Sequence, residues 1–159
     1  MPGDGEPAPE VLSVDQHGRP FHLSQLRGRW VVLYFYPKDE TVGCTREACA
    51  FRDNLSVLTS AGAEVVGVSV QDRAAHLQFA QRYDLPFRLL ADPQKRITTA
   101  YDALGILGLA KRVTYLVGPD GHIRDVYRSE LQPASHVDHV RTRLLELNSP
   151  GVGVPPPRT

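Results

Sequence analysis

The sequence predicts an α/β domain in which helices flank a central mixed sheet. The first observation is a pair of apolar runs, residues 30–36 and 64–70, with a helical pattern between them. Such a β-α-β crossover pairs its two strands in parallel and with right-handed connectivity. The second observation is a hairpin signal within residues 112–127, followed by an amphipathic helix. Together these patterns predict one sheet that has both parallel and antiparallel neighbours.

The first third of the chain predicts a small hairpin and then a buried strand. Residues 11–14 and 20–23 flank a turn at 15–18, which indicates an N-terminal β-hairpin extension. Residues 24–28 predict one helical turn closed by Gly28. The run 30–36 is continuously apolar and rich in β-branched and aromatic residues, which is typical of a central strand buried on both faces.

Helices and strands alternate through the rest of the chain. The spacing of Ala48, Phe51, Leu55 and Leu58 predicts a single helix that ends near residues 61–63. Asp72 is a candidate N-cap for a helix that continues to about residue 83. The remaining expected elements are a strand at 85–90, a helix at 94–101, strands at 112–117 and 123–127, and a helix from residue 133 with one apolar face.

This element order predicts a single domain over residues 1–148. A β-α-β unit followed by β-β-α on one sheet is the thioredoxin-like arrangement. Residues 149–159 contain four prolines and two glycines, which predicts a flexible tail.

Composition excludes some function classes. Among 159 residues, 18 are Lys or Arg and 18 are Asp or Glu, so the formal net charge is zero. This argues against a protein that binds nucleic acid or a membrane surface through bulk positive charge. The longest apolar run has seven residues, too few for a membrane span. The N-terminal residues lack a signal-peptide pattern and the chain has only two cysteines, so we expect a cytoplasmic protein.

The two cysteines, Cys44 and Cys49, lie where the chain leaves a central strand and enters a helix. Ligand sites in open α/β sheets lie at the carboxyl ends of strands. Cys44 falls in the first turn of the expected helix. Unpaired N–H groups and the helix dipole stabilise an anion there, and a thiolate is an anion. The position therefore favours a reactive thiol.

The spacing of the two cysteines leaves three interpretations open. In an intact helix, Cα atoms five residues apart are roughly 8–9 Å from each other, whereas a disulfide needs them within about 7 Å. A Cys44–Cys49 disulfide therefore requires the first helical turns to unwind. The second interpretation is two buried thiols that never meet. A zinc site is the weakest, because no histidine pair near the cysteines completes a ligand set.

The segment Pro37-x-x-x-Thr41-x-x-Cys44 resembles the active-site signature of the peroxiredoxins. The surrounding sequence, residues 35–39 and 43–49, has its second cysteine five residues after Cys44. It resembles the bacterioferritin-comigratory-protein (PrxQ) subfamily. Further matching segments extend the resemblance over roughly residues 5–147. One departure is Val42, where the subfamily usually has proline. We expect this change to alter loop mobility rather than chemistry.

The resemblance implies a thiol-dependent peroxidase that reduces hydrogen peroxide and organic hydroperoxides in antioxidant defence. It implies that Cys44 is the peroxidatic cysteine, whose thiolate becomes a sulfenic acid. Thr41 would hold the thiolate and the peroxide, and Pro37 would shield the reacting sulfur. Arg112 would stabilise the thiolate and the charge on the leaving oxygen, with Glu47 orienting the guanidinium.

The resemblance also implies how the enzyme is recycled. Cys49 would be the resolving cysteine, forming an intramolecular disulfide with Cys44 that thioredoxin or a similar dithiol protein reduces. No bound cofactor or metal is expected. Members of the subfamily are often monomers, and no cysteine follows Ser149, so we expect a monomer.

Alternative interpretations accompany these assignments. Thr41 could simply cap the helix, and Lys111 replaces Arg112 if the register is off by one. A general disulfide oxidoreductase is disfavoured by the absence of C-x-x-C, and a thiol redox sensor or holdase would use the same disulfide switch without sustained turnover. We interpret the six scattered histidines as surface residues: His17, His22, His76, His122, His136 and His139.

Overall fold

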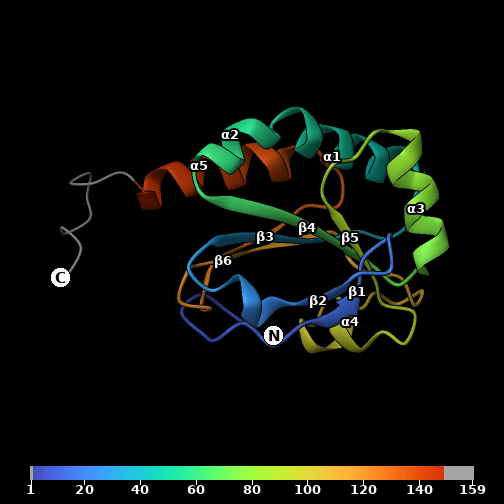
Figure 1. Ribbon diagram of the computed structural model, residues 1–159, viewed down its shortest axis with the longest axis horizontal. Coiled ribbons are helices and arrows are strands. Elements are labelled where there is room, and N and C mark those ends of the chain that lie inside the picture. Colours follow the sequence, from blue (N-terminus) through green and yellow to red (C-terminus); the bar gives the residue numbers. More distant parts are fainter. Residues whose placement is uncertain (1, 149–159) are drawn as a thin grey trace.

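A five-stranded sheet forms the centre of the molecule (Figure 1). The computed structural model describes residues 2–148, so the flexible tail expected at 149–159 lies outside the described residues. The strand order is β5-β4-β3-β6-β7. The strands β3 (Trp30–Phe35), β4 (Ala63–Ser69) and β5 (Arg88–Ala91) are parallel, while β6 (Val113–Val117) and β7 (Ile123–Arg128) pair antiparallel. The predicted mixed central sheet is confirmed.

Different elements cover the two faces of the sheet (Figure 1). The helices α1 (Val42–Asp53), α2 (Leu55–Ser60) and α5 (Ser135–Asn148) lie along one face, and α3 (Arg73–Arg82) stands at its end. The other face carries the hairpin of β1 (Leu12–Val14) and β2 (Pro20–His22), the 3₁₀ turn η1 (Leu23–Leu26), and α4 (Arg96–Ala100).

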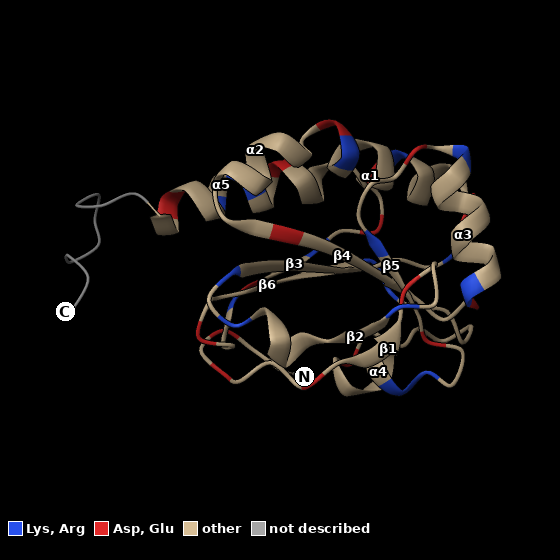
Figure 2. Ribbon diagram, in the orientation of Figure 1, with Lys and Arg blue, Asp and Glu red and all other residues tan. Residues whose placement is uncertain are grey.

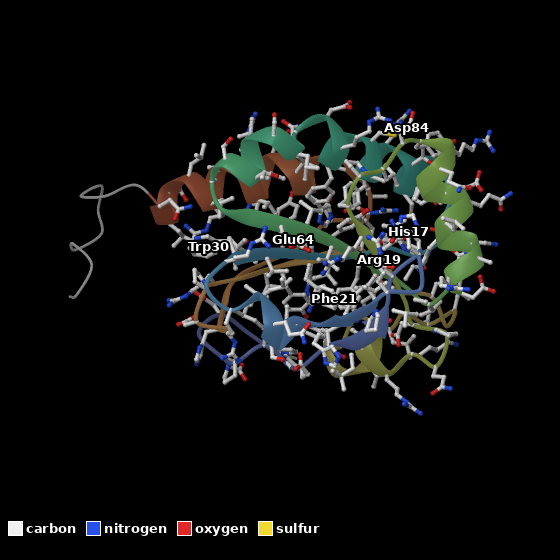
Figure 3. All side chains as sticks on the ribbon, viewed as in Figure 1. His17, Arg19, Phe21, Trp30, Glu64 and Asp84 are labelled. Atoms are coloured by element: carbon white, nitrogen blue, oxygen red, sulfur yellow. The ribbon has the colours of Figure 1, made fainter. Side chains whose placement is uncertain are left out.

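The central strand β3 contributes to both hydrophobic cores. Val32 and Tyr34 point to the core beneath α1, α2 and α5, whereas Val31 and Leu33 point to the core beneath the hairpin and α4. Because side chains alternate along a strand, a strand between two cores must be apolar at every position. This explains the unbroken apolar run in the sequence. Figure 3 shows Phe21 on the hairpin side of the sheet, in the second core.

The helix expected from the spacing of Ala48, Phe51, Leu55 and Leu58 is two helices, which corrects the prediction. The break is at Asn54, whose φ of −107° and ψ of 8° are not helical. The Asn54 side chain donates to the Ala50 carbonyl oxygen at 2.8 Å and so satisfies an acceptor at the end of α1. The apolar face continues across the break, which is why periodicity alone did not reveal it.

The interpretation of all six histidines as surface residues is wrong for two of them. His76 in α3 and His136 in α5 are completely buried. Both lie at helical spacing from apolar core residues, His76 three before Phe79 and His136 four before Val140. Both rings are stabilised by hydrogen bonds, which is the condition for burying a polar group.

Lys and Arg positions and Asp and Glu positions alternate along the helices and loops, and β4 carries an acidic position (Figure 2). The predicted cap of α3 is confirmed, since the Asp72 carboxylate accepts from the Ala75 N–H at 2.9 Å.

None of the helices within residues 2–148 combines the length and the apolar character that crossing a membrane would demand.

Candidate active site

Cys44 occupies the position predicted for it. The chain leaves the carboxyl end of β3, forms a loop over residues 36–41, and enters α1 at Val42. Cys44 is therefore in the first turn of α1, where backbone N–H groups have no helical partner. The residue is only 1% exposed, so its sulfur does not lie on an open surface.

Arg112 reaches Cys44 from the start of β6, 68 residues away in the sequence. Its Nη1 donates to Cys44 Sγ at 3.5 Å and to Glu47 Oε1 at 2.7 Å. Arg112, rather than Lys111, is therefore the residue that the structure places beside Cys44. One guanidinium nitrogen thus connects a buried sulfur with a buried carboxyl group, and Glu47 restrains the arginine beside the sulfur.

The space between Arg112 and α1 is tight at position 43. A Cβ atom on Gly43 would lie 3.0 Å from Arg112 Nη2 and 3.3 Å from Pro133 Cγ. A larger residue would therefore need these neighbours to shift by a few tenths of an ångström. The glycine before Cys44 therefore permits the approach of the arginine.

Burial dominates the electrostatics of Glu47. Its side chain is completely buried in the structure, and this burial raises its pKa to about 8, although the charge and hydrogen bond of Arg112 oppose the rise. Burial lowers the pKa of Arg112, but the facing Glu47 and Cys44 outweigh it and raise that pKa overall. Within residues 2–148, Glu47 Oε2 and Arg112 Nε are buried atoms without a hydrogen-bond partner.

His136 lies behind Glu47, and the sequence analysis missed it. Its Nε2 is 2.9 Å from the Ser129 carbonyl oxygen and its Nδ1 is 2.8 Å from Thr114 Oγ1. Burial lowers the pKa of His136 to about 4, so the ring is neutral at pH 7. The carbonyl oxygen can only accept, so Nε2 carries the hydrogen and Nδ1 accepts from Thr114. Glu47 Oε2, 3.6 Å from Nδ1, is beyond hydrogen-bonding distance.

Thr41 and Pro37 flank Cys44 on the loop side. Thr41 is the N-cap residue of α1, yet its side chain makes no capping hydrogen bond. Its hydroxyl instead donates to the Lys38 carbonyl oxygen at 2.9 Å, and its side chain is exposed. The hydroxyl oxygen can still accept a hydrogen bond from an incoming molecule. Pro37 is half-buried at the start of this loop.

Cys49 lies in the same helix as Cys44, five residues further on, and is half-buried. Both thiols are free, and α1 is continuous through both positions. The structure is therefore that of the dithiol state. A disulfide between these cysteines would need the helix to change, as their spacing predicts.

Two further buried residues near the loop were not singled out in the sequence, Asp39 and His76. They contact each other at 2.6 Å between Asp39 Oδ2 and His76 Nδ1. Helical periodicity could have identified His76, since it shares the buried face of α3 with Phe79 and Ala80. In residues 2–148 there is no group of three or more His, Cys, Asp and Glu side chains arranged to hold a metal ion.

Comparison with known proteins identifies the family. The model of the AhpC/TSA family matches residues 5–126. The chain belongs to the AhpC/TSA family. It is 42% identical over 147 residues to chloroplastic peroxiredoxin Q of Sedum lineare, covering 90% of this chain and 78% of that one. It is 43% identical over 136 residues to peroxiredoxin Q of Arabidopsis thaliana, covering 84% of this chain and 63% of that one.

Solved structures with the same fold agree with this placement. Peroxidoxin BcpB from Mycobacterium tuberculosis superposes with a TM-score of 0.87 at 32% identity, covering 94% of this chain and all of that one. The bacterioferritin comigratory protein of Xanthomonas campestris, described for its alkyl peroxide reduction activity, has a TM-score of 0.82 at 29% identity and covers 87% and 92% of the two chains. The thioredoxin-like fold and the peroxiredoxin Q resemblance are confirmed, and the chain is a peroxiredoxin.

Proposed function

We propose that Cys44 is the peroxidatic cysteine of this thiol-dependent peroxidase. Its thiolate attacks one oxygen of a hydroperoxide, so an S–O bond forms as the O–O bond breaks. Sulfur is oxidised to the sulfenic acid, and the other oxygen leaves as hydroxide or alkoxide, which becomes water or an alcohol on protonation. Hydrogen peroxide and organic hydroperoxides are the proposed substrates, and the alkyl peroxide activity described for the Xanthomonas relative supports the second class.

The observation that carries this proposal is the contact between Arg112 and Cys44. A guanidinium 3.5 Å from the sulfur stabilises the thiolate without a metal ion. The same positive charge faces the negative charge that develops on the leaving oxygen. Because Glu47 fixes the guanidinium before substrate arrives, little reorganisation is needed during the reaction.

Thr41 and Pro37 complete the proposed substrate site. The Thr41 hydroxyl already donates to Lys38, so its oxygen would accept a hydrogen bond from the peroxide. Pro37 would limit the access of water to the reacting sulfur.

Cys49 is the proposed resolving cysteine. Its thiolate attacks the Cys44 sulfenic acid, so an S–S bond forms while the S–O bond breaks and hydroxide leaves as water. An external dithiol protein of the thioredoxin type then reduces this disulfide and is itself oxidised. The presence of both cysteines in one helix supports an intramolecular bond.

Steady-state consumption of hydrogen peroxide with thioredoxin, thioredoxin reductase and NADPH tests the proposal. We expect turnover to vanish in Cys44→Ser and to fall sharply in Cys49→Ser. Turnover that survives Cys44→Ser would contradict the peroxidatic role. Oxidation of Cys44 without repeated recycling by thioredoxin would instead favour a redox sensor, and strong insulin reduction with negligible peroxide turnover would favour a disulfide oxidoreductase.

Two further expectations belong to this proposal. We propose that the protein acts as a monomer, since the disulfide is intramolecular, and sedimentation velocity of the reduced and oxidised forms tests it. We also retain the cytoplasmic location predicted from the sequence. The plant relatives named above are chloroplastic, so fractionation of the source cells is the measurement that decides the location.

A further inference from the structure

A buried polar cluster lies beside the loop that carries Pro37 and Thr41. We call it the Asp39 cluster, and it consists of Tyr36, Asp39, Gln71 and His76. The Tyr36 hydroxyl donates to Asp39 Oδ1 at 2.6 Å, and His76 Nδ1 is 2.6 Å from Asp39 Oδ2. The Asp39 N–H donates to the Gln71 side chain. The side chains of Asp39 and His76 are 3% and 0% exposed.

The hydrogen-bond roles within this cluster are fixed by geometry. His76 Nε2 lies 3.0 Å from the Leu90 carbonyl oxygen, which can only accept, so Nε2 carries a hydrogen. A hydrogen bond joins His76 Nδ1 and Asp39 Oδ2, which are 2.6 Å apart. Burial and the nearby Asp39 raise the pKa of Tyr36, so its hydroxyl remains a donor. Every polar atom of the ring and the carboxyl group therefore has a partner, as a buried cluster requires.

The cluster joins the loop to the rigid part of the fold. His76 belongs to α3 and Leu90 to β5, whereas Asp39 is two residues before Thr41 and five before Cys44. Figure 1 shows α3 standing at the end of the sheet next to the loop that precedes α1. The Asp39 carboxyl group thus links the loop to α3 through a buried contact with His76.

The loop needs such an attachment because its backbone is strained. Glu40 has a φ of +62°, a left-handed conformation that side-chain-bearing residues rarely adopt. The Glu40 side chain pairs with Arg82 at 2.8 Å, but 65% of the Arg82 side chain is exposed, so this pair contributes little. The buried contacts of Asp39 on the preceding residue are the ones that hold this conformation.

Building on the proposed peroxidase function, we propose that Asp39 and His76 are positioning residues for peroxide reduction. Their buried contact fixes the loop, and through it sets Thr41 at the N-terminus of α1 relative to Cys44. A peroxide then meets the sulfur in a defined orientation, and a shift of the loop by about 1 Å would lower the rate by up to about 100-fold.

The test compares two reactions of Cys44 in the reduced, full-length protein. Rapid mixing with hydrogen peroxide, followed by quenching and mass analysis, gives the rate constant of Cys44 oxidation. Alkylation by iodoacetamide reports the access and nucleophilicity of the same sulfur without using Thr41. We expect Asp39→Ala to lower the peroxide rate constant by about 10- to 100-fold and to leave alkylation within about twofold.

Asp39→Asn is the conservative variant. The asparagine oxygen accepts from Tyr36, and its NH₂ group donates to Nδ1 of a neutral His76 whose Nε2–H still faces Leu90. We therefore expect a peroxide rate constant within about threefold of wild type. Tyr36→Phe keeps the core packing but removes one partner of Asp39, and should lower the rate about three- to tenfold. Arg82→Gln breaks only the exposed contact and should stay within about twofold.

The outcomes separate the inference from the function on which it rests. A wild-type Cys44 that peroxide leaves unoxidised would overturn both. Oxidation of Cys44 at the wild-type rate in Asp39→Ala would overturn the positioning role alone. Equal losses of the peroxide rate constant in Asp39→Ala and Asp39→Asn would overturn it as well. If the alkylation rate of Cys44 rises while its peroxide rate constant falls, the loop is merely unfolded, and this outcome would also overturn the positioning role. If Asp39→Ala does not fold, an unchanged rate in Tyr36→Phe overturns the inference.

Discussion

Arg112 Nη1 lies 2.7 Å from Glu47 Oε1, and the two residues are 65 positions apart in the sequence, one just before β6 and the other in α1. The same nitrogen is 3.5 Å from Cys44 Sγ. The guanidinium is therefore shared between a buried sulfur and a buried carboxyl group.

Arg112→Lys should lower the rate constant of Cys44 oxidation by hydrogen peroxide about 100-fold. Lysine keeps the positive charge, but a single ammonium group cannot contact Glu47, the sulfur and the leaving oxygen with the fixed geometry of a guanidinium. The measurement is single-turnover oxidation without reductant. Lys111→Gln is the matched control on the neighbouring residue and should remain within about twofold. Equal effects of the two substitutions would contradict a specific role for Arg112.

The pH dependence of stability should reveal the buried Glu47. Its pKa is about 8 in the folded protein and 4.5 as the ordinary value. Between these values the folded state holds a proton that the unfolded state has lost, so stability falls as pH rises. The fall should be on the order of 1–2 kcal/mol between pH 6.5 and 8. His136 acts in the opposite direction below pH 6.5, because burial lowers its pKa to about 4.

Urea denaturation of wild type and Glu47→Gln from pH 5 to 8 isolates this contribution. Glutamine keeps the acceptor for Arg112 and places an NH₂ group toward His136 Nδ1, so the variant should fold. His136 is common to both proteins and cancels in the difference. Wild type should lose stability relative to Glu47→Gln as pH rises, and a difference that stays constant over this range would rule out a proton on Glu47.

Much of the fold follows from local patterns in the sequence. The run at residues 30–36 indicated a strand buried on both faces, and β3 contributes to both cores. The break at Asn54 was missed because the apolar face continues across it, and only the backbone angles and a side-chain hydrogen bond end α1 there. Hydrophobic periodicity reports which face is buried rather than whether the helix is continuous.

The active-site residues were predictable to different degrees. Cys44 and Thr41 belong to one contiguous motif, and Arg112 followed from the family resemblance. His136 and Asp39 could not be assigned in this way, because each forms its hydrogen bond with a residue on another element. His136 contacts Thr114 on β6, and Asp39 contacts His76 on α3. A histidine on an apolar helix face indicates burial, but its hydrogen-bond partners depend on the tertiary fold.

Oxidation should unwind the first part of α1. Both cysteines are free in a continuous helix. Cα atoms five residues apart in a helix are roughly 8–9 Å from each other, whereas a disulfide needs them within about 7 Å. Amide hydrogen exchange should therefore show lower protection over residues 42–50 in the oxidised protein, while α5 remains protected. Peroxide-treated Cys49→Ser is the control and should keep the protection of the reduced form. Equal protection of α1 in both redox states would exclude the intramolecular disulfide.

Val42→Pro should stabilise the reduced helix and slow disulfide formation. Val42 is the first residue of α1, where the amide has no helical partner, and proline is favoured at that position. The preceding Thr41 has a φ of −78° and a ψ of 156°, an extended conformation that a following proline accepts. The gain should be about 0.4–1 kcal/mol, because proline restricts the unfolded chain.

The measurements for Val42→Pro are urea denaturation of the reduced protein and the rate at which the Cys44 sulfenic acid becomes the disulfide. If α1 must unwind before the cysteines meet, this gain should slow the step about two- to fivefold. Val42→Ala is the control, since it removes the exposed side chain without adding the ring constraint and should leave the rate within about twofold. A stabilised Val42→Pro that resolves as fast as wild type would show that the cysteines meet without unwinding this turn.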